Sequence, residues 1–202
     1  MIITVAHTKG GVGKSTLAWN LAHSFLELGK KVTMIDLDFQ QTLYFLNAMR
    51  GGGLNVLQPQ SVSELLEVTL TKPDDTDIFI VDVGGFDSDI NRSAIDIAHK
   101  VVIPISESVT EVLGFKTFEG ILAHMVLDAK DFRVVLNNIH PLTKNFNTIK
   151  EALGENYTLM HSIIRSRKIY KTTLGFGSSV FDTRDETAKN EIRGVRDELI
   201  RT

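Results

Sequence analysis

Cysteine is absent from this chain of 202 residues. Disulfide bonds and cysteine-ligated iron–sulfur clusters are therefore excluded. Long apolar runs are missing as well, because none approaches the roughly 18–20 residues that a helix needs to span a bilayer. The first residues form an apolar stretch and a glycine-rich turn, which is not the pattern of a secretory signal peptide. We therefore expect a cytoplasmic protein.

The remaining composition is that of a globular protein, with 43% apolar residues and a mean hydropathy near zero. A chain of this length can bury a substantial core, and we expect one domain over residues 1–202. The net charge of −3 conceals an asymmetry. Residues 1–139 carry 11 basic and 17 acidic side chains, whereas residues 140–202 carry 11 and 8. The last third of the chain is therefore the part that favours a polyanionic partner.

Residues 8–16, T-K-G-G-V-G-K-S-T, are the most informative stretch. An apolar, β-branched run over residues 1–6 precedes them and predicts a buried strand. Apolar residues at helical spacing follow until Gly29, which predicts a helix and its end. Strand, glycine-rich turn and helix are the context of a phosphate-binding loop. Glycines at 10, 11 and 13 allow positive φ, so that backbone N–H groups can turn toward an anion.

This loop predicts a nucleotide site made by Gly10, Gly11, Val12, Gly13, Lys14, Ser15 and Thr16. Lys14 is placed to reach the β- and γ-phosphates. The Ser15 hydroxyl is placed to bind Mg²⁺, and Thr16 to donate to the α-phosphate. The alternative is a chance glycine turn beside a surface lysine, which the matching flanks on both sides disfavour.

The loop departs from the common pattern G-x-x-x-x-G-K-[ST], because Thr8 takes the first glycine position and a second lysine, Lys9, follows. The form K-G-G-x-G-K-[ST] resembles the deviant Walker A motif of the ParA/MinD family of ATPases. The resemblance extends over nearly the whole chain and is close to the short plasmid-partition subgroup that includes ParF. It implies ATP and Mg²⁺ as cofactors, and a Lys9 that reaches across a homodimer interface to the partner's nucleotide.

Two expected strands end in carboxylates. Residues 32–35 are followed by D-L-D-F-Q, and residues 78–81 by D-V-G-G. Carboxylates at the carboxyl ends of parallel strands point into the ligand crevice. The first stretch resembles the family's D-x-D-P-Q signature, with Phe39 in place of proline. By that match Asp38 acts on the attacking water, and Asp36 supports Mg²⁺ and the loop. Asp82 has the Walker B position and is expected to act on Mg²⁺. The alternative is a set of strand-end turn residues.

Residues 101–105 and 132–136 predict two further strands. The resemblance makes Asn137, after the second of them, the candidate for holding the adenine. Glu111 has two interpretations. It forms a capping box with Ser108 for a helix that continues to Leu127, or it links nucleotide state to dimerisation, as the aspartate at this position does in many relatives. Ser61 with Glu64, and either Asp87 or Ser88, predict two more helix caps.

Strand and helix patterns alternate along the whole chain. Further helices are expected over 41–49, from 61 to a stop at 73–75, over 90–98 and within 140–154. Further strands are expected over 54–57 and 157–164. A last helix is expected to carry Ile192, Val195, Leu199 and Ile200 on one face. This alternation predicts an α/β fold with a mostly parallel, twisted sheet and helices on both faces, in three layers. The resemblance makes it a P-loop NTPase. Because the first strand begins at residue 1, we expect no N-terminal helix-turn-helix domain.

Arg165, Arg167, Lys168 and Lys171 form a basic stretch without an intervening acid. The stretch predicts either a solvated helix face or a surface for DNA phosphates. The resemblance favours non-specific double-stranded DNA. It further implies an ATP-bound dimer on the nucleoid, and release after hydrolysis stimulated by a ParB-type centromere-binding partner.

Three alternatives compete with DNA partition. A ParA-like positioner of a protein cargo has almost the same sequence pattern. A MinD-like membrane regulator needs a cationic amphipathic C-terminal helix, whereas residues 189–202 have no aromatic residue and include Glu191, Asp197 and Glu198. We therefore expect no membrane partner. A metabolic P-loop ligase, such as a dethiobiotin synthetase relative, is disfavoured by Lys9 and by the basic last third.

Overall fold

The computed structural model describes residues 1–72, 75–85, 87–123, 125 and 131–201. Within them the strands form one sheet of seven, in the order β3-β2-β4-β1-β5-β6-β7, and every neighbouring pair is parallel. The strands are β1 (Ile2–Val5), β2 (Val32–Leu37), β3 (Asn55–Leu57), β4 (Ile78–Val83), β5 (Lys100–Ile105), β6 (Asp131–Ile139) and β7 (Tyr157–Arg165).

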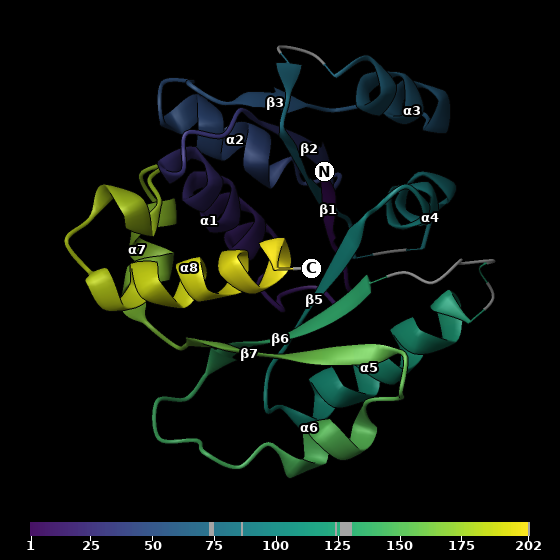
Figure 1. The fold of residues 1–202 in the computed structure, drawn as a ribbon, viewed down its shortest axis with the longest axis vertical. Helices are drawn as coiled ribbons and strands as arrows, with labels where there is room; N and C mark the ends of the chain where they lie inside the picture. The colour runs from purple at the N-terminus through teal and green to yellow at the C-terminus, as the bar shows by residue number, and fades with distance from the viewer. Residues whose placement is uncertain (73–74, 86, 124, 126–130, 202) are drawn as a thin grey trace.

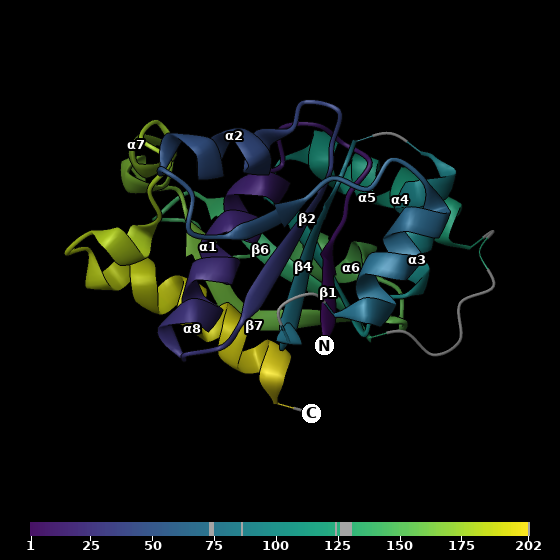
Figure 2. The same ribbon diagram turned by 90° about the horizontal axis from the view of Figure 1, so that it is seen from above.

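Helices cover both faces of this sheet, which makes three layers (Figures 1 and 2). One face carries α1 (Lys14–Glu27), α2 (Thr42–Met49), α7 (Lys168–Leu174), the short 3₁₀ helix η2 (Val180–Asp182) and α8 (Glu186–Ile200). The other carries α3 (Val62–Thr71), α4 (Asp89–Asp96), α5 (Val109–Leu122) and α6 (Asn147–Ala152). The predicted α/β architecture is confirmed.

Each face of the sheet has its own apolar core. In β1, Ile3 and Val5 pack on the α1 side, whereas Ile2 packs on the opposite side. Strands that are buried on both faces need apolar residues at every position, and this explains the continuous apolar runs in the sequence. Trp19 anchors the first core, and Phe115 of α5 the second.

The sheet order brings the predicted site residues to one edge. Strand β4 lies between β1 and β2, so Asp82 is in register with Val5 on one side and Asp36 on the other. All these strands run the same way, so the loop after β1 and both acids meet at their carboxyl ends. This is the edge at which parallel α/β sheets bind ligands.

Several element ends differ from the predictions. Strand β4 continues through Val83, and β6 through Ile139, so Asp82 and Asn137 lie inside strands rather than after them. Helix α3 ends at Thr71, with Lys72 at its C-terminus. Residues 73–74 of the predicted stop lie outside the described residues, as does Leu127. Among the helices that are described, none combines the length and apolar character that crossing a bilayer requires.

The predicted helix caps have mixed outcomes. Ser61 caps α3 by accepting the N–H of Glu64, although Glu64 bonds the N–H of Gln60 instead of completing the box. Ser88 caps α4, and Asp87 pairs with Arg92 instead.

The capping box of Ser108 and Glu111 is wrong, because the Ser108 side chain bonds to no N–H of α5. The Ser108 hydroxyl bonds to that of Thr110, and the Glu111 carboxylate accepts the N–H of Ser106 at 2.7 Å.

Candidate functional site: a phosphate-binding loop at the sheet edge

The loop between β1 and α1 has the backbone that an anion cradle requires. Gly11 and Gly13 adopt left-handed conformations, with φ of 79° and 90°, which side-chain-bearing residues rarely do. Gly10 does not share this conformation, contrary to the expectation. Gly13 is the N-cap of α1, so the backbone N–H groups of the first turn lie at an uncapped positive helix end. Helix N-termini of this kind bind phosphate.

An open cleft of about 530 Å³ lies in front of this loop. Its floor comprises Gly10, Gly11, Gly13, Lys14, Ser15 and Thr16, and Gly85 closes one side. Asp38, Phe39, Gln40 and Thr42, after β2, form another side. The structure thus brings together most of the residues that the sequence predicted for phosphates and Mg²⁺.

Lys14 is the buried cation of the cleft. Its ammonium donates to the carbonyl oxygen of Lys9 at 3.3 Å, within the loop itself. Burial lowers the pKa of Lys14, and the nearby Asp82 and Asp38 carboxylates oppose that shift. A cation held at the floor of a glycine-rich loop is suited to neutralise phosphate oxygens.

Asp82 is fully buried, and among the described residues no well-formed hydrogen bond reaches either of its carboxylate oxygens. Burial raises the pKa of Asp82 to about 7, the neighbouring Ser15 hydroxyl lowers it, and the Asp36 carboxylate raises it further. A buried carboxylate without partners is costly, and a cation compensates that cost.

These donors fit Mg²⁺ bound together with phosphates. Within the described ranges, no group of three or more acidic, histidine or cysteine side chains could hold a metal alone. Mg²⁺ at nucleotide sites is commonly held by one or two carboxylates plus substrate phosphates and water. Ser15 and Asp82 are the residues that would hold it here, and the predicted set of Ser15, Asp36 and Asp82 stays a prediction.

Asp36 accepts hydrogen bonds mainly from backbone N–H groups. One carboxylate oxygen accepts the N–H groups of Leu43 and Tyr44 at 2.9 and 3.1 Å, and the other accepts that of Asp38 at 3.3 Å. Asp36 therefore fastens the start of α2 to the end of β2, and its predicted support of the phosphate loop stays a prediction. Burial raises the pKa of Asp36. Its contribution to a metal stays a prediction.

Asp38 lies at the mouth of the cleft. It is half-buried, and its carboxylate accepts the N–H of Gln40 at 3.0 Å. The same carboxylate lies near enough to Lys14 to influence the pKa of that lysine. An acid at this place can orient a water molecule and accept its proton.

Lys9 lies along α5 of its own chain. Its ammonium donates to the Thr110 hydroxyl at 2.8 Å. Gly114 leaves room for this arrangement, because a Cβ there would lie 3.4 Å from Lys9 carbons. The backbone N–H of Lys9 donates to Nδ1 of His7 at 2.9 Å, and the His7 ring stacks on Phe118. The start of the loop is thus seated on one face of α5.

Sequence reasoning missed His7, Thr110 and Gly114. His7 is 1% exposed, and burial lowers its pKa to about 4, with the Lys14 and Lys9 charges acting in the same direction. The ring is therefore neutral and accepts the Lys9 N–H. A histidine at the end of a buried strand, two residues before the loop lysine, was the available signal. Thr110 and Gly114 have none, because their contacts join residues about one hundred positions apart.

A second, smaller pocket of about 140 Å³ lies behind the loop. Asn137 on β6 donates to the carbonyl of Val12 at 2.8 Å and lines this pocket together with Gly13. The position beside the phosphate loop is suited to a nucleoside. The predicted adenine contact of Asn137 is consistent with this place and stays a prediction.

The basic stretch is divided between two environments. Arg165, at the end of β7, donates to the carbonyls of His140 and Thr143, and Arg167 pairs with Glu191 of α8. Lys168 and Lys171 on α7 are exposed and form no ion pair within the part of the chain that the structure describes. The stretch has no acid in sequence, but Glu191 supplies one in space. Arg165, Arg167 and Lys171 also line the second pocket.

Comparisons with known proteins agree with this geometry. Residues 3–178 match the CobQ/CobB/MinD/ParA nucleotide binding domain. Protein ParA of Rhizobium radiobacter is 28% identical over 187 residues, which cover 89% of this chain and 84% of that protein.

Two solved structures share the fold. A chain of the MinC:MinD cell division protein complex of Aquifex aeolicus aligns with a TM-score of 0.76 at 19% identity, over 98% of this chain and 95% of that one. A Borrelia burgdorferi structure named as a plasmid partition protein bound to AMPPNP aligns with a TM-score of 0.71 at 20% identity, over 100% and 99%. Given the match over residues 3–178, the chain belongs to the CobQ/CobB/MinD/ParA nucleotide-binding family, as a P-loop ATPase of the ParA/MinD type.

Proposed function

We propose that this protein is a ParA-type ATPase for DNA partition, in which Mg·ATP drives dimerisation and dimers bind double-stranded DNA. The observation that carries the proposal is Lys9. Its ammonium forms an exposed contact beside the cleft, bonded to the neutral Thr110 hydroxyl and, among the described residues, to no carboxylate. A cation so weakly held can leave Thr110 and bind the phosphates of a second copy.

The residues divide the chemistry of ATP hydrolysis. The loop N–H groups and Lys14 hold the phosphates, and Ser15 with Asp82 would hold Mg²⁺, which supplies charge neutralisation when bound. Asp38 orients the attacking water and accepts its proton. Lys9 of a partner neutralises charge that develops on the γ-phosphate. This interaction exists only in the triphosphate-bound dimer, so ATP stabilises the dimer more than ADP does.

Dimerisation also explains ATP-dependent DNA binding. Two copies double the number of exposed lysines from α7, and affinity for DNA falls or rises steeply with the number of phosphates contacted. Hydrolysis, stimulated by a ParB-type centromere-binding partner, then releases both the dimer and the DNA. The protein would be cytoplasmic, nucleoid-associated when ATP-bound, and would act through residues 1–202 as one domain.

Two alternatives to DNA partition remain. A ParA-like positioner of a protein cargo would use the same nucleotide cycle with another partner. A membrane-cycling regulator like MinD needs an amphipathic helix whose apolar face is free. In this fold the apolar face of α8, with Ile192, Val195 and Leu199, is buried in the core, which disfavours that role for α8.

The decisive experiment is light scattering with size exclusion, in ADP and in a non-hydrolysable ATP analogue, with and without duplex DNA. We expect monomers in ADP, and dimers that co-elute with DNA in the analogue. Lys9→Ala should keep its affinity for the analogue and stay monomeric, with Lys30→Ala, at an exposed lysine in the turn between α1 and β2, as the matched control. Co-sedimentation with anionic liposomes instead of DNA would favour the membrane alternative. A protein that stays monomeric throughout contradicts the proposal.

A further inference from the structure

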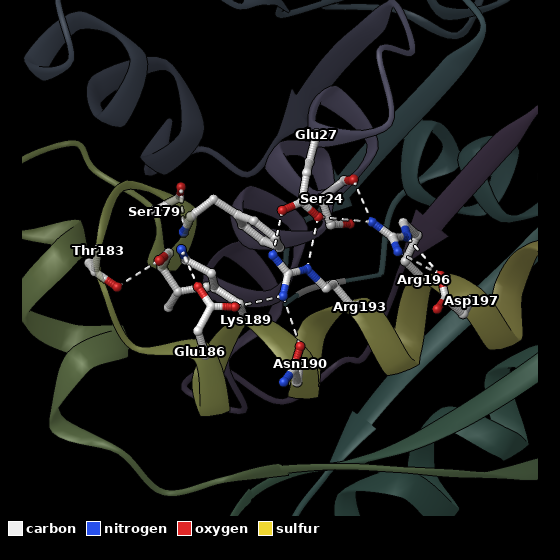
Figure 3. A network of polar contacts seen from close by, with 12 residues as sticks. Ser24, Glu27, Ser179, Thr183, Glu186, Lys189, Asn190, Arg193, Arg196 and Asp197 are labelled. Carbon is white, nitrogen blue, oxygen red and sulfur yellow. Dashed lines mark hydrogen bonds and ion pairs between the residues drawn. The ribbon is translucent and has the colours of Figure 1, made fainter.

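Helix α8 is firmly attached to α1, the helix that follows the phosphate loop (Figure 3). Arg193 forms two hydrogen bonds with the Glu27 carboxylate, at 2.9 and 2.6 Å. Arg196 donates to the carbonyl oxygen of Ser24 at 2.9 Å and also pairs with Glu27. The attachment is partly buried, so α8 and α1 form one unit behind the loop.

The same helix holds the basic stretch, residues 165–171 and named the basic segment from here on, through a single side chain, Glu191. Its carboxylate accepts the backbone N–H of Arg165 at 3.2 Å and two N–H groups of the Arg167 guanidinium at 2.9 and 2.7 Å. It also accepts the hydroxyl of Tyr170 at 3.0 Å. The Glu191 side chain is only 11% exposed. One carboxylate therefore fixes three positions between the end of β7 and α7.

Those positions form a wall of the pocket behind the phosphate loop. Arg167 and Tyr170 line it together with Gly13 and Asn137. Tyr170 is buried, and its single hydroxyl proton is shared between Glu191 and the Ala188 carbonyl of α8, which lies 3.1 Å away. The shape of this wall thus depends on α8, and α8 in turn is fastened to α1. A nucleoside that enters the pocket meets a surface that Glu191 holds in place.

Arg167 also faces solvent, because 31% of its side chain is exposed. A DNA phosphate at the neighbouring Lys168 and Lys171 can therefore reach its guanidinium. A guanidinium that is doubly bonded to a carboxylate must give up charge-assisted hydrogen bonds before it can bind phosphate. The ion pair thus opposes DNA binding while it supports the pocket wall.

We propose that Glu191 is a positioning residue that holds Arg167 in the wall of the nucleotide pocket and withholds it from DNA. This inference deepens the proposed function and rests on it for the place of the nucleoside and the identity of the polyanion. According to this proposal, Glu191 supports nucleotide binding and opposes DNA binding. A residue with a merely structural role would weaken both.

The test is Glu191→Gln, which preserves size and removes the charge. The wall residues then lose the charge-assisted hydrogen bonds that fix them, so we expect about tenfold weaker binding of a fluorescent ATP analogue. Duplex DNA binding, measured at saturating analogue, should strengthen several-fold, and the log–log salt slope should steepen by about one phosphate per protomer. Glu186→Gln, on the exposed side of the same helix, should change neither.

Tyr170→Phe separates the two halves of the proposal. It removes one bond to Glu191 and leaves the ion pair with Arg167, so analogue binding should weaken while the DNA salt slope stays unchanged. This variant also tests the role of the pocket wall if Glu191→Gln does not fold. Unchanged analogue affinity in both variants, or DNA binding that falls in parallel with it, overturns the proposal. Wild-type protein that binds the analogue but no DNA would refute the proposed DNA function alone, because the effect of Glu191→Gln on the analogue would still test the pocket wall.

Discussion

The phosphate loop and the basic segment differ in what determines their state. The loop owes its shape to glycines and a helix start within residues 8–16, and its acids lie near the carboxyl ends of β4, which neighbours β1, and of β2, which neighbours β4. The basic segment owes its state to groups on other elements and loops, since Glu191, His140 and Thr143 decide what its arginines contact. The chemistry of a local motif can therefore be predicted from the sequence, whereas whether a charged side chain is free to bind a ligand cannot.

The largest effect is expected inside the loop. Lys14→Ala removes the buried cation from the floor of the cleft, so binding of ATP should be abolished, with affinity reduced by at least two orders of magnitude. Calorimetric titration with an ATP analogue measures this loss, and Lys30→Ala, at an exposed position in the turn between α1 and β2, is the matched control. Ordinary affinity in Lys14→Ala would refute the assignment of the loop.

Asp38→Ala should have the second largest effect. Loss of the group that accepts the proton of water should lower hydrolysis by about two orders of magnitude, because general-base catalysis contributes on that scale. ATP binding should persist, so the variant should accumulate as a DNA-bound dimer. Asp89→Ala, at the first turn of α4, is the control for loss of one negative charge. If phosphate release from Asp38→Ala continues at the wild-type rate, another acid acts on the water.

These two variants concern features that were predictable from the sequence. The parallel sheet, the loop and the strand-end acids follow from apolar runs and glycine spacing, and the structure brings them to one edge. The commitment of Asp36 to the start of α2 was not predictable in detail, because it depends on where the chain turns after β2. The cis contact of Lys9 with Thr110 depends on the packing of α5, which no local pattern encodes.

The basic segment gives the next prediction. Lys168→Glu with Lys171→Glu should weaken DNA binding about equally for all sequences and lower the salt slope by about two, because both ammonium groups are exposed. Arg165→Gln should lower the salt slope by less than one and mainly reduce thermal stability, because its guanidinium is bonded to two carbonyls. Filter binding across salt concentrations, together with thermal melting, compares them. Equal salt slopes for Arg165→Gln and the double-lysine variant would show that the exposed and internal charges are equivalent.

The smallest expected effect concerns His7, where the loop meets α5. The folded-state pKa is about 4, below the ordinary value of 6.5, so between these values the unfolded chain binds a proton that the folded chain does not. The contribution of His7 to stability is therefore complete above pH 6.5 and is lost as the pH falls toward 4. By pH 5 this loss amounts to about 2 kcal/mol, at 1.36 kcal/mol per pKa unit.

His7→Asn isolates that contribution, because the asparagine oxygen can still accept the N–H of Lys9 but does not titrate. Urea unfolding at pH 7.5 and pH 5 should show a smaller loss of stability for the variant than for the wild type. Burial also lowers the pKa of His23, but that residue is present in both proteins, so its contribution cancels in the difference. Equal losses would mean that the ring of His7 is protonated in the folded protein. The contact that seats the loop on α5 would then need another explanation, because a protonated Nδ1 cannot accept the Lys9 N–H.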